Sequence, residues 1–136
     1  MSQAERLRNI LTLPKTIAIV GAKDKPGQAV DGVGRYLVEA GYTVVPVHPV
    51  AGEVWGLKAY PSLADVPVDI DIVDVFRAPE FCTAHAREAA ALPHRPQAFW
   101  MQLGISSADA RSVAEAAGMD VVEDACIKIE HRQLFA

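Results

Sequence analysis

The stretch Thr16-Ile17-Ala18-Ile19-Val20-Gly21-Ala22-Lys23-Asp24-Lys25-Pro26-Gly27 decides the fold. Ile17 to Val20 form an unbroken apolar run, which is typical of a central parallel strand covered on both faces. Gly21 then allows a sharp turn, and a helical pattern begins near Val30. Because a helix start offers N–H groups and a positive dipole end, this unit predicts a site for a phosphate-bearing ligand. An ordinary tight turn in an α/β domain is the alternative.

The glycine loop departs from the common nucleotide-binding motifs. The dinucleotide fingerprint requires a glycine two residues after Gly21, where this chain has Lys23, and no P-loop sequence follows. The next apolar run, residues 42–49, ends in Val47-His48-Pro49, whereas an NAD-binding unit ends this strand in Asp or Glu. Both departures weigh against NAD.

The bulk composition is that of one ordinary globular domain, here residues 1–136 with residues 1–14 as a helix packed on it. The 136 residues are 51% apolar and 22% charged, and the net charge of −4 argues against a general nucleic-acid binder. No apolar run reaches the length of a membrane span and no signal-like segment begins the chain, so a cytoplasmic protein without membrane attachment is expected. The cysteines and histidines are scattered, which predicts no disulfide framework and no metal site.

Periodicity and breakers predict an alternating β/α order. Strands are expected at 16–20, 42–49, 69–76, 98–104 and 119–122, and helices near 2–13, 30–40, 79–92 and 106–117. The 51–61 segment is expected to form a short hairpin or loop, and residues 62–66 a single helical turn. The tail after Asp124 is expected to be either irregular or helical. Ser106 and Asp109 form the expected cap of one helix, and the expected apolar face of another is Phe81, Cys82, His85, Ala86, Ala89 and Ala90.

This order predicts an α/β fold, Rossmann-like and doubly wound, with a mostly parallel five-stranded sheet and helices on both faces. In such sheets ligands bind beyond the carboxyl ends of the strands, where the winding reverses. Four segments are expected to converge there: Gly21-Ala22-Lys23, Val47-His48-Pro49, Phe76-Arg77-Ala78 and Trp100-Met101-Gln102.

At these residues the chain resembles the small stand-alone CoA-binding proteins, whose domain is related to the N-terminal domain of the succinyl-CoA synthetase alpha subunit and also occurs in ADP-forming acyl-CoA synthetases. The matching elements, which run from about residue 17 to 131, are Val20-Gly21-Ala22 with Lys25-Pro26, Val45-Pro46-Val47 with Pro49, Val73 to Arg77, Trp100 to Gly104, and Asp124 to Glu130. Lys23 departs from the family, which commonly has a small polar residue there.

The resemblance implies that the ligand is CoA or an acyl-CoA. Backbone N–H groups of Gly21, Ala22 and Lys23 are then expected to hold the pyrophosphate, with charge added by Lys23, Lys25 or Arg77. Val47 and Pro49 would form an apolar rest for the adenine, with His48 and Ala78 in the same segments. Phe76 is expected to pack on the adenine or pantetheine, and Gln102 to reach the pantetheine amides.

No catalytic set is recognisable, and the chain lacks the phosphohistidine domain of the succinyl-CoA synthetase alpha subunit. The sequence therefore favours a non-catalytic binding module or carrier over the alternative, an NAD(P)-dependent oxidoreductase or other nucleotide-binding Rossmann protein. Cys126 has suggestive chemistry, a mixed disulfide with CoA, although a structural thiol is the favoured interpretation. An acyl-CoA enzyme is one expected partner, and a homodimer through exposed Trp55 and Tyr60 is another.

Overall fold

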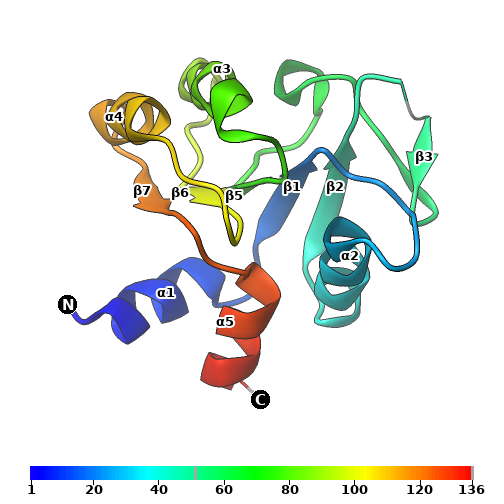
Figure 1. The fold of residues 1–136 in the computed structure, drawn as a ribbon, viewed down its shortest axis with the longest axis horizontal. Coiled ribbons are helices and arrows are strands. Elements are labelled where there is room, and N and C mark those ends of the chain that lie inside the picture. Colours follow the sequence, from blue (N-terminus) through cyan, green and yellow to red (C-terminus); the bar gives the residue numbers. More distant parts are fainter. Residues whose placement is uncertain (51, 136) are drawn as a thin grey trace.

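A computed structural model describes residues 1–50 and 52–135 and confirms the α/β fold (Figure 1). Ala51, in the predicted hairpin segment, and Ala136, the last residue of the predicted domain, lie outside the described residues. The main sheet has five parallel strands in the order β2-β1-β5-β6-β7. They are β1 (Thr16–Val20), β2 (Thr43–Val47), β5 (Ile72–Val75), β6 (Ala98–Met101) and β7 (Asp120–Val122).

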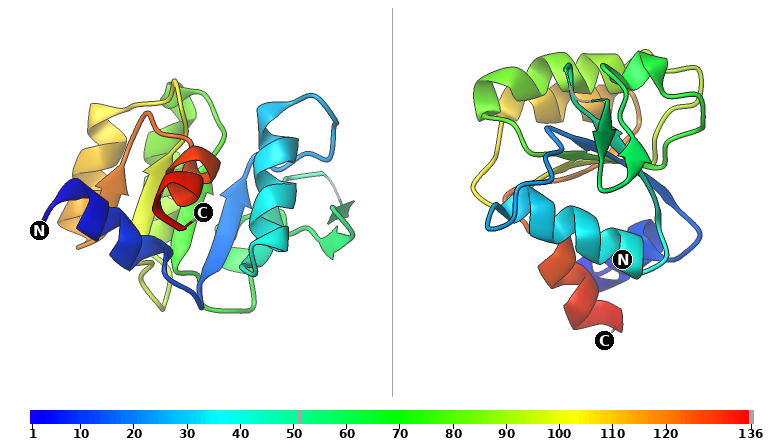
Figure 2. Two further views of the ribbon diagram at one scale, coloured as in Figure 1. Left: turned by 90° about the horizontal axis from the view of Figure 1, so that it is seen from below. Right: turned by 90° about the vertical axis from the view of Figure 1, so that its right-hand side faces the viewer.

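Helices cover both faces of this sheet (Figure 2). One face carries α1 (Gln3–Leu11), α2 (Ala29–Glu39) and α5 (Ile127–Phe135), and the other carries α3 (Pro79–Ala90) and α4 (Ala108–Ala116). Successive strand residues point to opposite faces, so a strand covered on both sides must be apolar throughout. Ile17 and Ile19 accordingly join the core beneath α1, α2 and α5, while Ala18 and Val20 join the core beneath α3 and α4.

The winding reverses between β1 and β5. β1 pairs with β2 on one side and with β5 on the other. The crossover from β1 to β2 runs through α2 on one face of the sheet, whereas α3 and α4 lie on the opposite face. Among the strands of the main sheet this is the order 2-1-3-4-5, whose ligand site lies at the carboxyl ends of the first and third strands. The loops after β1 and β5 therefore flank the expected site.

A small hairpin follows β2, as the Gly- and Pro-rich segment predicts. It consists of β3 (Glu53–Val54) and β4 (Leu57–Lys58), which are antiparallel, and is followed by the 3-10 turn η1 (Leu63–Asp65). Trp55 at its tip is half-buried rather than exposed. A Cβ on Gly34 of α2 would meet the Trp55 ring within 2.1 Å, and Trp55 Nε1 donates to Asp31 Oδ1 at 3.0 Å. This contact fixes the hairpin on α2. Trp55 and Tyr60, expected to be exposed at a dimer surface, are both half-buried, and the dimer stays a prediction.

Two helix details differ from the sequence expectation. The cap of α4 is Ser107, not Ser106, because the Ser107 hydroxyl accepts from the N–H of Ala110. Phe81, predicted on the buried face of α3, is 45% exposed, since Cys82, Ala86 and Ala89 already fill that face. Ser2 caps α1, because its hydroxyl accepts from the N–H of Glu5 at 3.1 Å.

Within the described ranges, none of the helices has the length and apolar character needed to cross a membrane. Across residues 1–50 and 52–135, His, Cys, Asp and Glu side chains nowhere gather in a group of three or more suited to a metal ion.

Candidate functional site

A pocket of about 320 Å³ lies at the carboxyl ends of β1, β2 and β5, where the winding reverses. Three of the four predicted segments meet in its wall. The residues that line it are Gly21, Lys23, His48, Pro49, Phe76, Arg77 and Ala78.

Gly21 is required by the close approach of the two loops that form the pocket. Its φ is +86°, a conformation that glycine adopts readily, and a Cβ there would lie 2.6 Å from the carbonyl oxygen of Phe76. The same Cβ would lie 3.3 Å from Cδ of Arg77. The stem of Arg77 therefore rests on the glycine loop, and any larger residue at position 21 would push the two walls apart.

Backbone hydrogen bonds join the loop after β1 to the end of β2 beside the pocket. The N–H groups of Gly21 and Ala22 both donate to the carbonyl oxygen of Val47, at 3.0 and 3.4 Å. These two groups, expected to hold a pyrophosphate, are thus already used inside the protein. The side chain of Val47 is only 4% exposed and belongs to the core beneath α3. Of the two residues expected to support an adenine, Pro49 is the one that lines the pocket.

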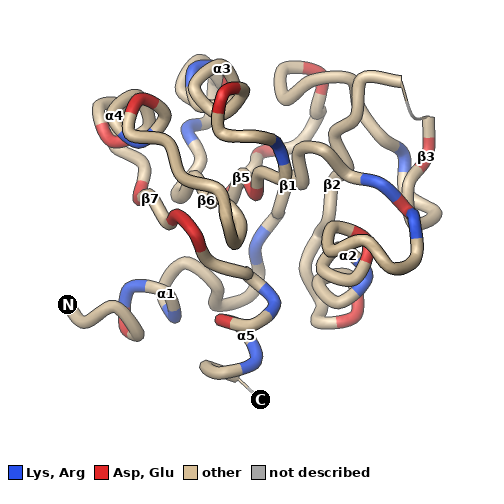
Figure 3. Tube along the Cα trace, in the orientation of Figure 1, with Lys and Arg blue, Asp and Glu red and all other residues tan. Residues whose placement is uncertain are grey.

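Two basic residues line the pocket. The loop between β1 and α2 carries Lys23, Asp24 and Lys25 in succession, and a basic residue also marks the turn before α3 (Figure 3). Lys23 lines the pocket, whereas exposed Lys25 is not among the lining residues. Arg77 lines it from the turn between β5 and α3. Two cations therefore face one small volume, which suits an anion.

The amino terminus of α3 opens onto the same pocket. Ala78 is its N-cap residue and makes no side-chain capping bond, and Pro79 starts the helix without an N–H to satisfy. The positive end of the helix dipole adds to the two cations. Behind it the Cys82 thiol donates to the carbonyl oxygens of Arg77 and Ala78, at 3.7 and 3.6 Å. Burial raises the pKa of Cys82, which favours the protonated thiol that donates these two hydrogen bonds to the turn.

The fourth predicted segment serves a different purpose. Gln102 is 4% exposed, and its Oε1 accepts from the N–H of Ile127 at 3.1 Å, at the start of α5. Its carbonyl group is therefore occupied in holding α5, rather than directed at a ligand. Cys126 directly precedes α5 and is half-buried against the core beneath that helix. Neither residue lines the pocket.

Asp74 is a buried carboxyl group in the middle of β5. It is 0% exposed, and neither of its oxygens has a hydrogen-bond partner among the described residues. Strand alternation places it on the same face as Ile72, beneath α2 and α5. Burial raises the pKa of Asp74 well above its ordinary value, because a charge without a partner is costly in an apolar surrounding.

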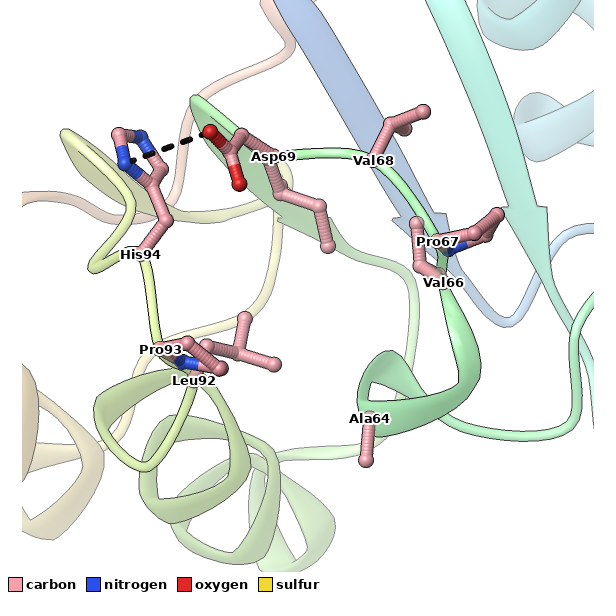
Figure 4. A pocket seen from close by; sticks show the side chains of 9 residues that line it. Ala64, Val66, Pro67, Val68, Asp69, Leu92, Pro93 and His94 are labelled. Atoms are coloured by element: carbon pink, nitrogen blue, oxygen red, sulfur yellow. Dashed lines mark ion pairs between the residues drawn. The ribbon is translucent and has the colours of Figure 1, made fainter.

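A second hollow, of about 200 Å³, lies near the amino end of β5 (Figure 4). Its wall is mostly apolar, from Val66, Pro67 and Val68 on one side and Leu92 and Pro93 on the other. One ion pair crosses it, between His94 Nδ1 and Asp69 Oδ2 at 3.8 Å, and both side chains are largely exposed. Exposed pairs of this kind contribute little energy.

Arg77 makes a set of contacts that the sequence did not predict. The guanidinium lies 4.3 Å from the centroid of the Phe81 ring, and its Nη1 lies 3.5 Å from His85 Nε2. His85 Nδ1 in turn lies 2.7 Å from Glu88 Oε1. The spacing 77, 81, 85 and 88 was the available signal, because residues three or four apart share one face of a helix.

Fold and pocket together define a class: a doubly wound α/β domain with a pocket at its switch point that is lined in part by two basic residues. Residues 15–132 match the CoA binding domain family, and the chain belongs to that family. The resemblance drawn from the sequence is thereby confirmed, and so is the Rossmann-like fold.

Relatives of two kinds are found. The protein YneT of Bacillus subtilis (strain 168) is 37% identical over 130 residues, covering 96% of this chain and 94% of YneT. The structure of a hypothetical protein from Pyrococcus horikoshii OT3 superposes with a TM-score of 0.94 at 36% identity, covering 99% of this chain and 94% of that one. The ADP-forming acetate–CoA ligase of Methanocaldococcus jannaschii is 32% identical over 62 residues, which are 46% of this chain and 9% of the ligase.

Proposed function

We propose that the chain binds CoA or an acyl-CoA in the pocket between the loops after β1, β2 and β5, as a binding module or carrier and not as a catalyst. The observation that carries the proposal is the lining of that pocket. Lys23, Arg77 and the uncapped start of α3 supply positive charge, and Pro49 and Phe76 supply apolar surface. A ligand with phosphates joined to an apolar ring or chain needs both.

The phosphates would be held mainly by side chains and helix ends. Gly21 and Ala22 have their N–H groups bonded to Val47, which leaves Lys23 and Arg77 as the charged donors that line the pocket. A hydrogen bond to a charged group contributes about 1.5–3 kcal/mol. The amino terminus of α2, where Gln28 makes no side-chain capping bond, offers a further positive dipole end after the same loop.

A role without catalysis is supported by the chemistry of the lining. Gly21, Pro49, Phe76 and Ala78 offer no nucleophile or general base. Lys23 and Arg77 suit charge recognition, because an arginine stays protonated in proteins. His48 also lines the pocket, and its Nδ1 accepts from the N–H of Val50 at 3.1 Å.

Isothermal titration with CoA, acetyl-CoA, NAD and NADP side by side tests the proposal. We expect micromolar binding of CoA or acetyl-CoA, weakened tenfold or more by Arg77→Ala, a loss of about 1.4 kcal/mol. Arg132→Ala is the matched control, because it removes the same charge from an exposed position on α5 and should leave the affinity unchanged within about twofold.

Binding of NADP without binding of CoA would overturn the proposal and favour the oxidoreductase alternative. Equal losses from Arg77→Ala and Arg132→Ala would place the ligand elsewhere, because the effect would then reflect net charge rather than the pocket.

A further inference from the structure

The side chain of Arg77 is held on three sides before any ligand arrives. Its stem lies against Gly21, where a Cβ would come within 3.3 Å of Cδ. Its guanidinium lies over the Phe81 ring, 4.3 Å from the centroid, and a cation over an aromatic face is attracted to it. The third contact is the 3.5 Å approach of Nη1 to His85 Nε2.

The third contact has a required direction. An arginine can only donate, so His85 Nε2 must be the acceptor and carry no proton. In a neutral imidazole the proton then sits on Nδ1, which faces Glu88 Oε1 at 2.7 Å. An ionised carboxylate only accepts, so Glu88 stabilises this tautomer. The three groups form one chain of hydrogen bonds, from Arg77 to His85 and from His85 to Glu88.

The middle of this chain is shielded from water, since the side chain of His85 is 16% exposed and that of Glu88 33%. His85 and Glu88 lie three residues apart on α3, so the helix fixes their mutual positions, and Arg77 reaches them from the turn just before that helix. Arginine has many rotamers, and a ligand that binds a loose one must order it first. A side chain already fixed at the pocket avoids that cost.

We propose that His85 and Glu88 are positioning residues for ligand binding: Glu88 fixes the tautomer of His85, and His85 holds the guanidinium of Arg77 ready for an anionic group of the ligand. The proposal rests on the proposed function, because it assumes that Arg77 binds the ligand. It adds two residues that do not line the pocket.

The first test compares two substitutions at one site by titration with CoA. His85→Leu keeps the bulk and removes the acceptor, and we expect the Kd to rise three- to tenfold. His85→Gln restores a carbonyl acceptor and should return the Kd to within twofold of wild type. In an Arg77→Ala background, His85→Leu should change the Kd by less than twofold, because the group that it positions is gone.

An equal loss in His85→Leu and His85→Gln would overturn the proposal, as would a loss that persists in the Arg77→Ala background. Thermal unfolding of each variant identifies any that fail to fold. The Kd values of the variants that do fold then test the proposal.

The second test needs no ligand. In ¹⁵N-labelled wild-type protein, NMR of the His85 ring should show a protonated Nδ1 and an unprotonated Nε2, and Glu88→Leu, which removes the acceptor, should give a mixture of tautomers. A wild-type ring with the proton on Nε2 would overturn the proposal. If CoA fails to bind wild type, the proposed function fails, while the ring signals still decide whether His85 is arranged to hold Arg77.

Discussion

The pocket after β5 and the hollow before it lie at opposite ends of the same strand and differ in what surrounds them. The pocket combines Lys23, Arg77 and a glycine loop, whereas the hollow is lined mainly by valine, proline and leucine. Their volumes, about 320 and 200 Å³, are too similar to explain why only one of them would suit an anionic ligand. The two cavities differ instead in the charge of their walls, and this difference follows from the direction in which the chain runs through the helix beside them.

Helix α3 shows why the two ends differ. It begins at the pocket, next to Ala78, and ends at Ala90, shortly before Leu92 and Pro93 in the wall of the hollow. Its positive dipole end therefore faces the pocket and its negative end faces the hollow. In a parallel α/β fold each crossover helix repeats this direction, so anions are favoured at the carboxyl ends of the strands.

The largest expected effect comes from breaking the pocket at its tightest point. We expect Gly21→Ala to lower the free energy of unfolding by about 2–4 kcal/mol, because both backbone strain and the 2.6 Å clash with Phe76 oppose it. Urea denaturation measures the loss. Gly27→Ala is the matched control: its φ is +93°, but nothing lies within 4 Å of the added Cβ. It should cost only about 1–2 kcal/mol. Equal losses would show that the clash is relieved at no cost.

The middle of β5 offers the next test, through Asp74. Its raised pKa means that the folded protein keeps a proton which the unfolded chain releases above about pH 4. Stability should therefore fall as the pH rises from about 4 toward the raised pKa, by about 1.4 kcal/mol for each pH unit. Asp74→Asn cannot ionise and should lack this slope. Urea titrations of both proteins between pH 5 and 7 measure the difference. Parallel profiles would mean that Asp74 is charged in the folded state.

The smallest effect is expected at the hollow. Asp69→Asn and His94→Ala each break the exposed 3.8 Å ion pair. We expect changes within about 0.5 kcal/mol in stability and within about twofold in CoA affinity. Chemical denaturation and titration check the two expectations. A tenfold loss of CoA affinity in either variant would erase the distinction between the two ends of β5.

Much of this arrangement could be predicted from the sequence, because it depends on periodicity and on glycine. The run from Ile17 to Gly21 located the central strand and the loop that follows it. Segments at three strand ends were correctly expected to meet, since parallel strands bring their carboxyl ends to one edge.

What could not be predicted depends on side-chain partners far apart in the chain. Gln102 resembles a ligand contact in sequence, and only the fold shows that its partner is Ile127. The use of the Gly21 N–H by Val47 likewise depends on how closely two loops approach. Asp74 lies inside the strand predicted at 69–76, but periodicity says nothing about whether a buried acid has a partner.

The contact between Trp55 and α2 has an optical consequence. The chain has two tryptophans; Trp100 is 0% exposed, whereas Trp55 is half-buried and bonded to Asp31 in the first turn of α2. Iodide in solution should quench the emission of Trp55 and leave that of Trp100 unchanged. Because α2 follows the lysine-bearing loop, the quenchable part of the fluorescence is an internal, label-free reporter of movement at that end of the molecule.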